Sequence, residues 1–354
     1  MKPTRALPML ALLFFGFIVS AAAFNGFYDK WGFRDNKANA SLQTYFDGTT
    51  FKPFAFRRLV PDIADAIDGA LPQGVHDRIA ARLVNDGFPI LHNAPPVALR
   101  EPYVVRYHLV YYGMFACFCA LFAAMYACGR VVGTQPLAAF AAASGSILIF
   151  PYFQSVGGYF YDYSEYLLFL LFLIAARKGS WPAMLLLGVL GGWNKESFLF
   201  FAPTAWTFLP GHLRARTKAA IIGGTVALAA IAYEVQRWRF GGNGGTSGEK
   251  HWMEHLQFLT SPSTLFGHEQ TYGVVGPTPF NIVFLLAVTG VAIRGWPRVE
   301  PATRTHIKIA AAINIPLYFA LGFPGEIRGL SMLAPGLLLL GGAALASWAD
   351  ADRA

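Results

Sequence analysis

The chain has 354 residues, of which 55% are hydrophobic and only 14% are charged, and its formal net charge is +8. Apolar runs of about 20 residues, the length needed to cross a bilayer, recur along it, so the composition excludes an ordinary soluble domain. The basic residues lie between these runs, where they signal topology. We therefore expect membrane lipids, and no nucleic acid, among the partners.

The apolar runs predict an all-α fold, a polytopic transmembrane helical bundle of about nine or ten membrane segments. We expect residues 1–354 to form a single integral membrane domain. The first run also resembles a secretory signal peptide, but the rest of the chain is polytopic, and we interpret this run as an uncleaved span. The predicted spans are Ala6–Phe24, Tyr103–Cys128, Pro136–Tyr152, Tyr166–Ala176, Ala219–Val235, Thr278–Ile293, Ile307–Leu321 and Leu330–Trp348.

The stretch Trp181–Pro210 is too long for one span and too short for two, and it carries the polar residues Asn194–Ser197 at its middle. Basic residues precede it at 177–178 and follow it at 214–218. If both basic clusters lie in the cytoplasm, the chain must enter the membrane and return. The sequence thus predicts two half-helices that meet near the outer side, with a cytoplasmic N-terminus.

Two long polar segments are predicted to lie on the outer side. The first, residues 25–102, contains two stretches with helical apolar periodicity, 56–71 and 75–84, which predict amphipathic helices on the membrane surface or on the bundle. The second, residues 236–277, mixes aromatic and basic residues and is predicted to be a partly ordered interfacial loop.

Charged residues from separate segments converge on the outer side in this topology. Together they suit one chemistry, because a carboxylate can accept the proton of an attacking hydroxyl while cations neutralise a departing phosphate. Each also has a simpler interpretation: solvated loop acids, interfacial arginines, helix-capping acids at 162 and 165, and local pairs at 195–196 and 326–328. The converging residues are Asp29, Asp35, Asp47, Arg57, Arg58, Asp162, Glu165, Lys195, Glu196, Glu326 and Arg328.

Three segments, Lys52–Pro61, Gly191–Ser197 and Gly325–Pro335, carry aromatic–Arg–x–Leu–x–Pro, Asn–Lys–Glu–Ser and Glu–x–Arg elements in this order. In these elements the chain resembles the polyprenyl-phosphate-dependent membrane glycosyltransferases of the GT-C superfamily, in particular small bacterial members. The resemblance implies an outward-facing site in the inner (plasma) membrane and a polyprenyl-phosphate lipid donor. It also implies an acidic base in the first loop.

On this hypothesis, Asp47 or Asp29 deprotonates the acceptor, and Glu196 is a further catalytic candidate. The chain departs from the better-known members because it has no adjacent acidic pair after the first span. The competing hypothesis is a transporter or flippase for a lipid-linked or anionic solute. The expected donor-phosphate ligands are Arg57, Arg58, Lys195 and Arg328, and the carboxylates expected to bind sugar hydroxyls, orient the cations or hold a divalent metal are Asp162, Glu165 and Glu326.

Overall fold

The structure is a computed structural model that describes residues 6–86, 93–246, 248 and 250–351. Helices account for 74% of it, and one two-stranded hairpin is the sheet found in the described part, which confirms the predicted all-α class. Five helices in these ranges are long and apolar enough to cross a membrane. The protein thus has the character of a multi-pass membrane protein.

Each predicted span falls on a helix. The helix α1 continues past Phe24 to Trp31, so that Asp29 lies on a helix and not in the predicted loop. The helix α15 follows directly from a 3-10 helix, η5. The long helices are α1 (Ala6–Trp31), α5 (Val104–Val131), α6 (Pro136–Phe153), α7 (Phe160–Arg177), α8 (Trp181–Asn194), α10 (Ala215–Phe240), α13 (Ile282–Gly295), α14 (Pro301–Leu321) and α15 (Ala334–Ala351); η5 spans Ile327–Leu333 and η4 spans Trp296–Arg298.

The predicted return of the chain within 181–210 has a clear structural counterpart. The helix α8 ends at Asn194, Lys195 adopts an extended backbone with φ −168°, and the chain continues through α9 (Ser197–Phe201) and the 3-10 helix η3 (Ala202–Phe208). A Cβ built on Gly179 would lie 3.1 Å from Pro210, so the two ends of the stretch are neighbours. The expected continuous second half-helix is wrong in detail, because a proline at the start of η3 disfavours α-helical bonding.

Small residues allow α8 and α10 to pack closely. A Cβ on Gly188 would lie 2.8 Å from the backbone oxygen of Thr225, and one on Gly192 would collide with the backbone of Ala229. The two glycines are four residues apart, and so are the residues they face, which is the small-residue spacing that lets membrane helices approach. This contact fixes the first half of the hairpin against a full-length helix.

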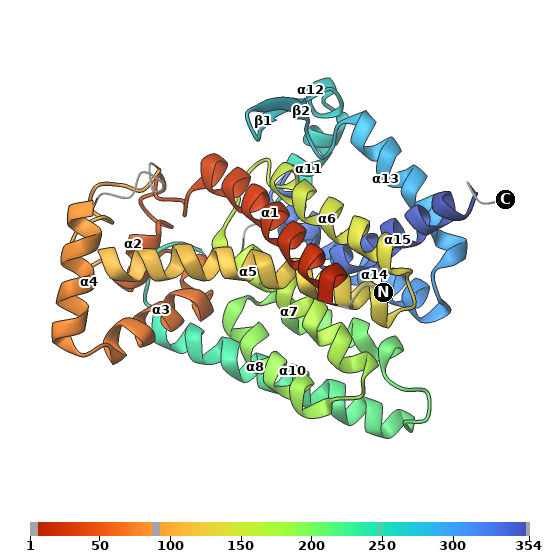
Figure 1. Ribbon diagram of the computed structural model, residues 1–354, viewed down its shortest axis with the longest axis horizontal. Coiled ribbons are helices and arrows are strands. Elements are labelled where there is room, and N and C mark those ends of the chain that lie inside the picture. Colours follow the sequence, from red (N-terminus) through yellow and green to blue (C-terminus); the bar gives the residue numbers. More distant parts are fainter. Residues whose placement is uncertain (1–5, 87–92, 247, 249, 352–354) are drawn as a thin grey trace.

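Short helices cover one end of the bundle. They confirm the two amphipathic helices predicted there, and Pro61 is the third residue of its helix, where a proline is tolerated. Figure 1 shows α2, α3 and α4 at one end of the long axis, with α13 and α15 toward the other. The elements are α2 (Leu42–Phe46), η1 (Phe54–Phe56), α3 (Leu59–Ala70) and α4 (Gln73–Asp86).

The second predicted loop is more ordered than the sequence indicates. The helix α10 extends to Phe240, and α11 (Trp252–Thr260) and α12 (Pro262–Leu265) are followed by strands β1 (His268–Thr271) and β2 (Val274–Pro277). The strands pair antiparallel in the register His268 to Pro277. Tyr272 and Gly273 form the two-residue turn, both with positive φ, as a tight hairpin requires. Glu269 pairs with Lys30 at 2.9 Å and so attaches the hairpin to the end of α1.

Candidate functional site

Charged side chains from separate helices meet at the end of the bundle that α3 covers. Each makes a direct ion pair with another member. They come from the residue after η1, from α7, from the break after α8, and from the first residues of η5 and the residue before it. We call them the charged cluster: Arg57, Asp162, Glu165, Lys195, Glu196, Glu326 and Arg328. The cluster brings together seven of the residues that the sequence predicted for the site.

Lys195 lies at the centre of the cluster. Its Nζ is 2.8 Å from Glu165 Oε2 and 3.2 Å from Asp162 Oδ1. The two acids are three residues apart on α7 and therefore share a helix face. Asp162 also accepts a hydrogen bond of 3.1 Å from the backbone N–H of Tyr159, so the helix-capping interpretation is confirmed together with the ion pair.

Arg328 joins the cluster from the other side. It donates to Asp162 Oδ1 at 3.2 Å and to Glu326 Oε1 at 2.6 Å, so Asp162 is shared by two cations. The local pair expected for Glu326 and Arg328 exists, but its arginine is buried and not solvated. The second oxygen of Glu165 accepts hydrogen bonds from the hydroxyls of Ser197 and Ser331.

Arg57 and Glu196 form the outer part of the cluster. The guanidinium donates through Nε at 3.1 Å and through a terminal nitrogen to the two Glu196 oxygens, and it donates to the Tyr161 hydroxyl at 2.8 Å. Burial alone would lower the pKa of Arg57, but the charge of Glu196 raises that pKa well above its ordinary value. Glu196 therefore pairs with Arg57, and Lys195 pairs with acids of α7, so the simpler interpretation of Lys195 and Glu196 as a local pair is wrong.

Arg58 lies next to the cluster but pairs elsewhere. Its guanidinium is 2.7 Å from Asp62 and donates to the backbone oxygen of Tyr45. Its backbone N–H donates to Trp193 O at 3.1 Å, and the Trp193 indole donates to Asp62 at 3.0 Å. These contacts attach the start of α3 to the end of α8, at the tip of the helical hairpin of residues 181–210.

The first-loop acids lie apart from the cluster in the described part of the chain. Asp47 accepts a hydrogen bond of 2.7 Å from the Tyr103 hydroxyl, and Asp29 accepts one of 2.8 Å from Asn25. Asp35 accepts from Tyr107 at 2.8 Å and from the Leu42 N–H. Burial raises the pKa of Asp35, and these hydrogen bonds offset part of the rise. The base role of Asp47 or Asp29 stays a prediction that the resemblance alone supports.

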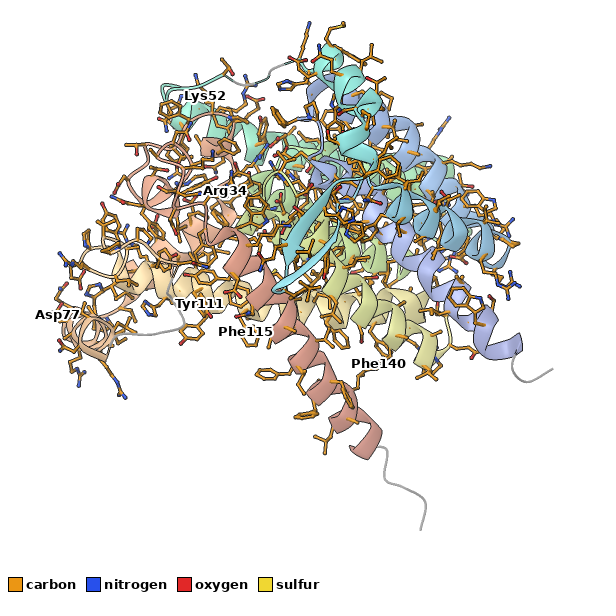
Figure 2. All side chains as sticks on the ribbon, turned by 90° about the horizontal axis from the view of Figure 1, so that it is seen from above. Arg34, Lys52, Asp77, Tyr111, Phe115 and Phe140 are labelled. Carbon is orange, nitrogen blue, oxygen red and sulfur yellow. The ribbon has the colours of Figure 1, made fainter. Side chains whose placement is uncertain are left out.

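Sequence analysis missed Arg34, which lies in the turn after α1. The residue is 6% exposed, its Cζ is 4.9 Å from the Trp31 ring and 5.1 Å from the Tyr159 ring, and its Nε is buried without a partner. Figure 2 places it in the same half of the molecule as Lys52 and Asp77. Its one sequence signal is weak: an arginine among aromatic residues just beyond a span.

The carboxylates of the cluster are already engaged. The described residues contain no group of three His, Cys, Asp or Glu side chains arranged to hold a metal ion. Asp162, Glu165 and Glu326 instead direct their oxygens at Lys195 and Arg328 and at serine hydroxyls. In this geometry they orient the cations.

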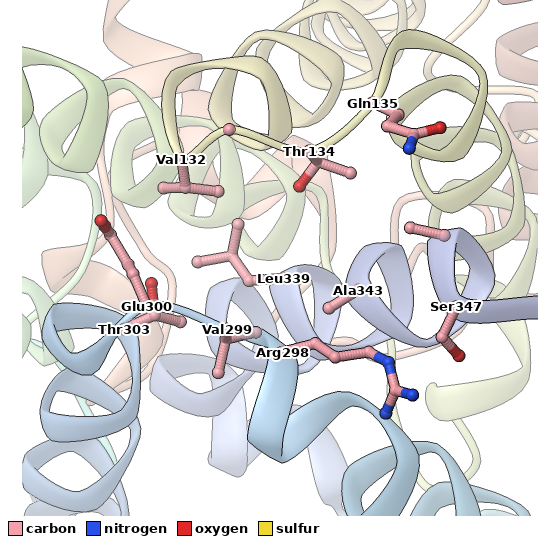
Figure 3. Close-up of a pocket in the computed structure, with 12 residues that line it drawn as sticks. Val132, Thr134, Gln135, Arg298, Val299, Glu300, Thr303, Leu339, Ala343 and Ser347 are labelled. Atoms are coloured by element: carbon pink, nitrogen blue, oxygen red, sulfur yellow. The ribbon is translucent and has the colours of Figure 1, made fainter. Parts of the chain in front are cut away.

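A cavity of about 290 Å³ lies near the opposite end of the bundle (Figure 3). It is bordered by the loop after α5, the start of α14 and the second half of α15, and no member of the charged cluster lines it. Polar groups occur on its wall, among them the buried Thr303 hydroxyl, for which the described residues offer no hydrogen-bond partner. Its lining includes Thr134, Arg298, Glu300, Thr303, Leu339 and Ser347.

Buried charge is confined to one end of the molecule. In the described ranges, the buried arginine, lysine, aspartate and glutamate residues are Arg57, Asp162, Glu165, Lys195 and Arg328 of the cluster, together with Arg34 and Arg58. The geometry thus defines one polar site on an otherwise apolar bundle. Compared with the models of known protein families, with curated proteins and with solved structures, the chain matches none of them.

Proposed function

We propose that the protein is a membrane glycosyltransferase of the GT-C type, which transfers a sugar from a polyprenyl-phosphate-linked donor to an acceptor hydroxyl. In this proposal about nine or ten segments lie in the inner membrane, the N-terminus is cytoplasmic and the charged cluster faces outward. The resemblance of the three sequence elements motivates the donor class. All three elements contribute side chains to the charged cluster or contact it.

The observation that carries the proposal is the alternation of carboxylates and cations within the cluster. Arg57, Lys195 and Arg328 are each fixed by carboxylates. Fixed charges in a site with little water stabilise developing charge without reorganising, which is the largest contribution in many enzymes. Such an arrangement suits a reaction in which a proton leaves one oxygen while negative charge grows on a phosphate.

Glu196 is the carboxylate of the cluster best placed to react. Its side chain is 30% exposed, against 20% for Glu326 and 0% for Asp162. We propose that Glu196 accepts the proton of the acceptor hydroxyl. The acceptor oxygen then bonds to the anomeric carbon, the bond from that carbon to the phosphate oxygen breaks, and polyprenyl phosphate leaves with its charge opposite Lys195 and Arg328.

A transporter or flippase remains the competing hypothesis, and it requires access from both sides of the membrane. The confinement of buried charge to one end of the described structure supports a site with one-sided access. At the opposite end of α7 the described ion pair, Arg177 with Glu300, is partly exposed and includes no member of the charged cluster. The enzyme hypothesis is therefore the one that the geometry supports best.

The substitution Glu196→Gln tests the proposal. Purified protein in nanodiscs would be supplied with polyprenyl-phosphate-linked hexoses, and release of polyprenyl phosphate would be followed by mass spectrometry. We expect the variant to lose about 100-fold or more of the release rate, as for removal of a general base, while it stays folded at the assay temperature with a melting temperature lowered by the loss of the charge opposite Arg57. Glu254→Gln on the exposed face of α11 is the control. Release that is equal in the variant and the wild type would contradict the assignment.

A further inference from the structure

Arg34 differs from every cation of the charged cluster because it has no carboxylate beside it. Arg57, Lys195 and Arg328 each contact at least one acid. For Arg34, the described residues provide ring contacts with Trp31 and Tyr159 and neither an ion pair nor a hydrogen bond to its side chain. A guanidinium does not lose its proton in a protein, so this buried residue carries an uncompensated charge.

Such an arrangement is costly. Burying an unpaired charge costs more free energy than contacts with aromatic rings return. Arg34 also has φ 62°, in the left-handed region that residues other than glycine adopt only with strain. An unpaired, strained and buried arginine is explained if an anion completes its surroundings.

A second unsatisfied donor also lies beside Tyr159. Arg328 Cζ is 4.6 Å from the Tyr159 ring, and its Nε is buried with no partner in the described part of the chain. The segment 154–159 is hydrogen-bonded to residues near both arginines in the chain. Trp31 Nε1 donates to Gln154 O at 3.0 Å, and Ser155 donates to Gly325 O at 3.0 Å.

Two glycines let this segment pack closely against its neighbours. A Cβ on Gly158 would collide with the Trp31 indole, and one on Gly157 would lie 3.2 Å from Glu326 Oε1 and 3.8 Å from Arg328 Nε. Both arginines therefore lie close to the same ring. A planar carboxylate satisfies one guanidinium in a bidentate manner, whereas a phosphate has oxygens for two.

We propose that Arg34, with the free Nε of Arg328, binds the phosphate group of a ligand beside Tyr159. Arg34 would be the anion-binding residue of the site to which we assigned a phosphate-linked donor. The inference therefore rests on the proposed function. It adds to the cations expected to hold the phosphate an arginine that no described carboxylate compensates, whereas Arg57, Lys195 and Arg328 are each paired with an acid. The phosphate belongs to a lipid or to a soluble phosphate compound.

The test measures binding, without turnover. The full chain in nanodiscs is titrated with inorganic diphosphate and, separately, is reconstituted with polyprenyl phosphate or with phosphatidic acid before native mass spectrometry. We expect wild type to bind at least one of these probes and Arg34→Gln to weaken that binding at least tenfold. Retention of the lipids alone identifies a lipid phosphate, and binding of diphosphate alone identifies a soluble ligand.

The control is Arg237→Gln, since Arg237 is an exposed arginine in the last turn of α10 and pairs with Glu234. Removal of an uncompensated buried charge should leave the melting temperature of ligand-free Arg34→Gln unchanged or raise it. The proposal is overturned if wild type binds no probe, if Arg34→Gln binds as tightly as wild type, or if this variant unfolds without ligand while Arg34→Lys does not. Phosphate binding without any sugar transfer would support this inference and contradict the proposed function.

Discussion

At the scale of single residues, the burial of Lys195 decides what the residue can do. It lies between two acids that are almost wholly inaccessible to solvent, at 0% and 2% exposure. A buried ion pair adds little net stability because both charges must be desolvated, but removal of one partner leaves the other charge stranded. Lys195 is therefore needed for the fold as well as for any chemistry at the site.

We predict that Lys195→Met lowers the free energy of unfolding by about 3–5 kcal/mol. The variant strands Glu165, while Asp162 keeps Arg328. Unfolding in mixed micelles measures the change, and Lys178→Met, at an exposed position after α7, is the control. Equal stability of Lys195→Met and the control would show that water or a neighbouring group compensates the acids.

Asp35 gives a pH dependence of stability. Burial raises its pKa in the folded protein, and the hydrogen bonds from Tyr107 and Leu42 offset only part of this effect. A carboxyl group with a raised folded pKa contributes stability below its unfolded pKa of about 3.9, and it loses this contribution as pH rises through the folded pKa. We therefore expect stability to fall as pH rises above the unfolded pKa of about 3.9 and through the raised folded pKa.

The substitution Asp35→Asn should remove this part of the pH dependence and make the protein more stable at neutral pH. The amide keeps one acceptor for the Leu42 N–H and offers a donor to the Tyr107 hydroxyl. Melting temperatures of both proteins between pH 4 and pH 8 provide the measurement. A wild-type profile that Asp35→Asn leaves unchanged would assign the titration to another group.

At the scale of elements, the close approach of α8 and α10 holds the re-entrant helical hairpin of residues 181–210 in place. We predict that Gly192→Ala costs about 1–3 kcal/mol, because the new methyl group meets the backbone of α10, which cannot rotate away as a side chain can. Gly223→Ala on the exposed face of α10, where a Cβ meets nothing within 4 Å, should be neutral or stabilising by up to about 1 kcal/mol. Thermal unfolding in detergent distinguishes the two, and equal effects would mean that the helices separate at little cost.

Hydropathy and charge predicted the elements well wherever the environment of a whole segment decides the outcome. The spans, the amphipathic helices and the break at Lys195 all follow from the cost of placing polar groups in a membrane. The short elements α11, α12, β1 and β2 were not predicted because they carry too few residues for a periodic signal. Which charges pair was also inaccessible, since Arg57 and Glu196 are 139 residues apart in the chain.

At the scale of the whole molecule, the contact of Gly179 with Pro210 brings together the two ends of the helical hairpin of residues 181–210, so that the chain enters and leaves it on the same side of the bundle. We predict that cysteines introduced at Ser180 and Thr217 react with a membrane-impermeant reagent from the same side of the membrane. A cysteine at Asp77 on α4 should react from the other side. The native cysteines, which lie within α5, are first replaced by alanine. Labelling of Ser180 and Thr217 positions from opposite sides would exclude a re-entrant hairpin.

The same whole-molecule view explains why Arg34 escaped sequence analysis. Its isolation depends on Trp31 and Tyr159, which are brought together only when α1 packs beside the segment before α7. Nothing in the local sequence distinguishes an arginine that meets a carboxylate from one that does not. The members of the charged cluster could be listed from the sequence, whereas the balance of charge among them required the fold.

Burial of the charged cluster has a consequence for its behaviour in different media. Dissolved ions weaken the attraction between exposed charges over a Debye length of about 8 Å at physiological ionic strength, but they screen buried pairs much less. The pairs of Lys195 with Asp162 and Glu165 should therefore keep their strength when the surrounding salt changes. The exposed basic residues at the far end of α7 have no such protection. The cluster is thus insulated from the salinity of whichever compartment it faces.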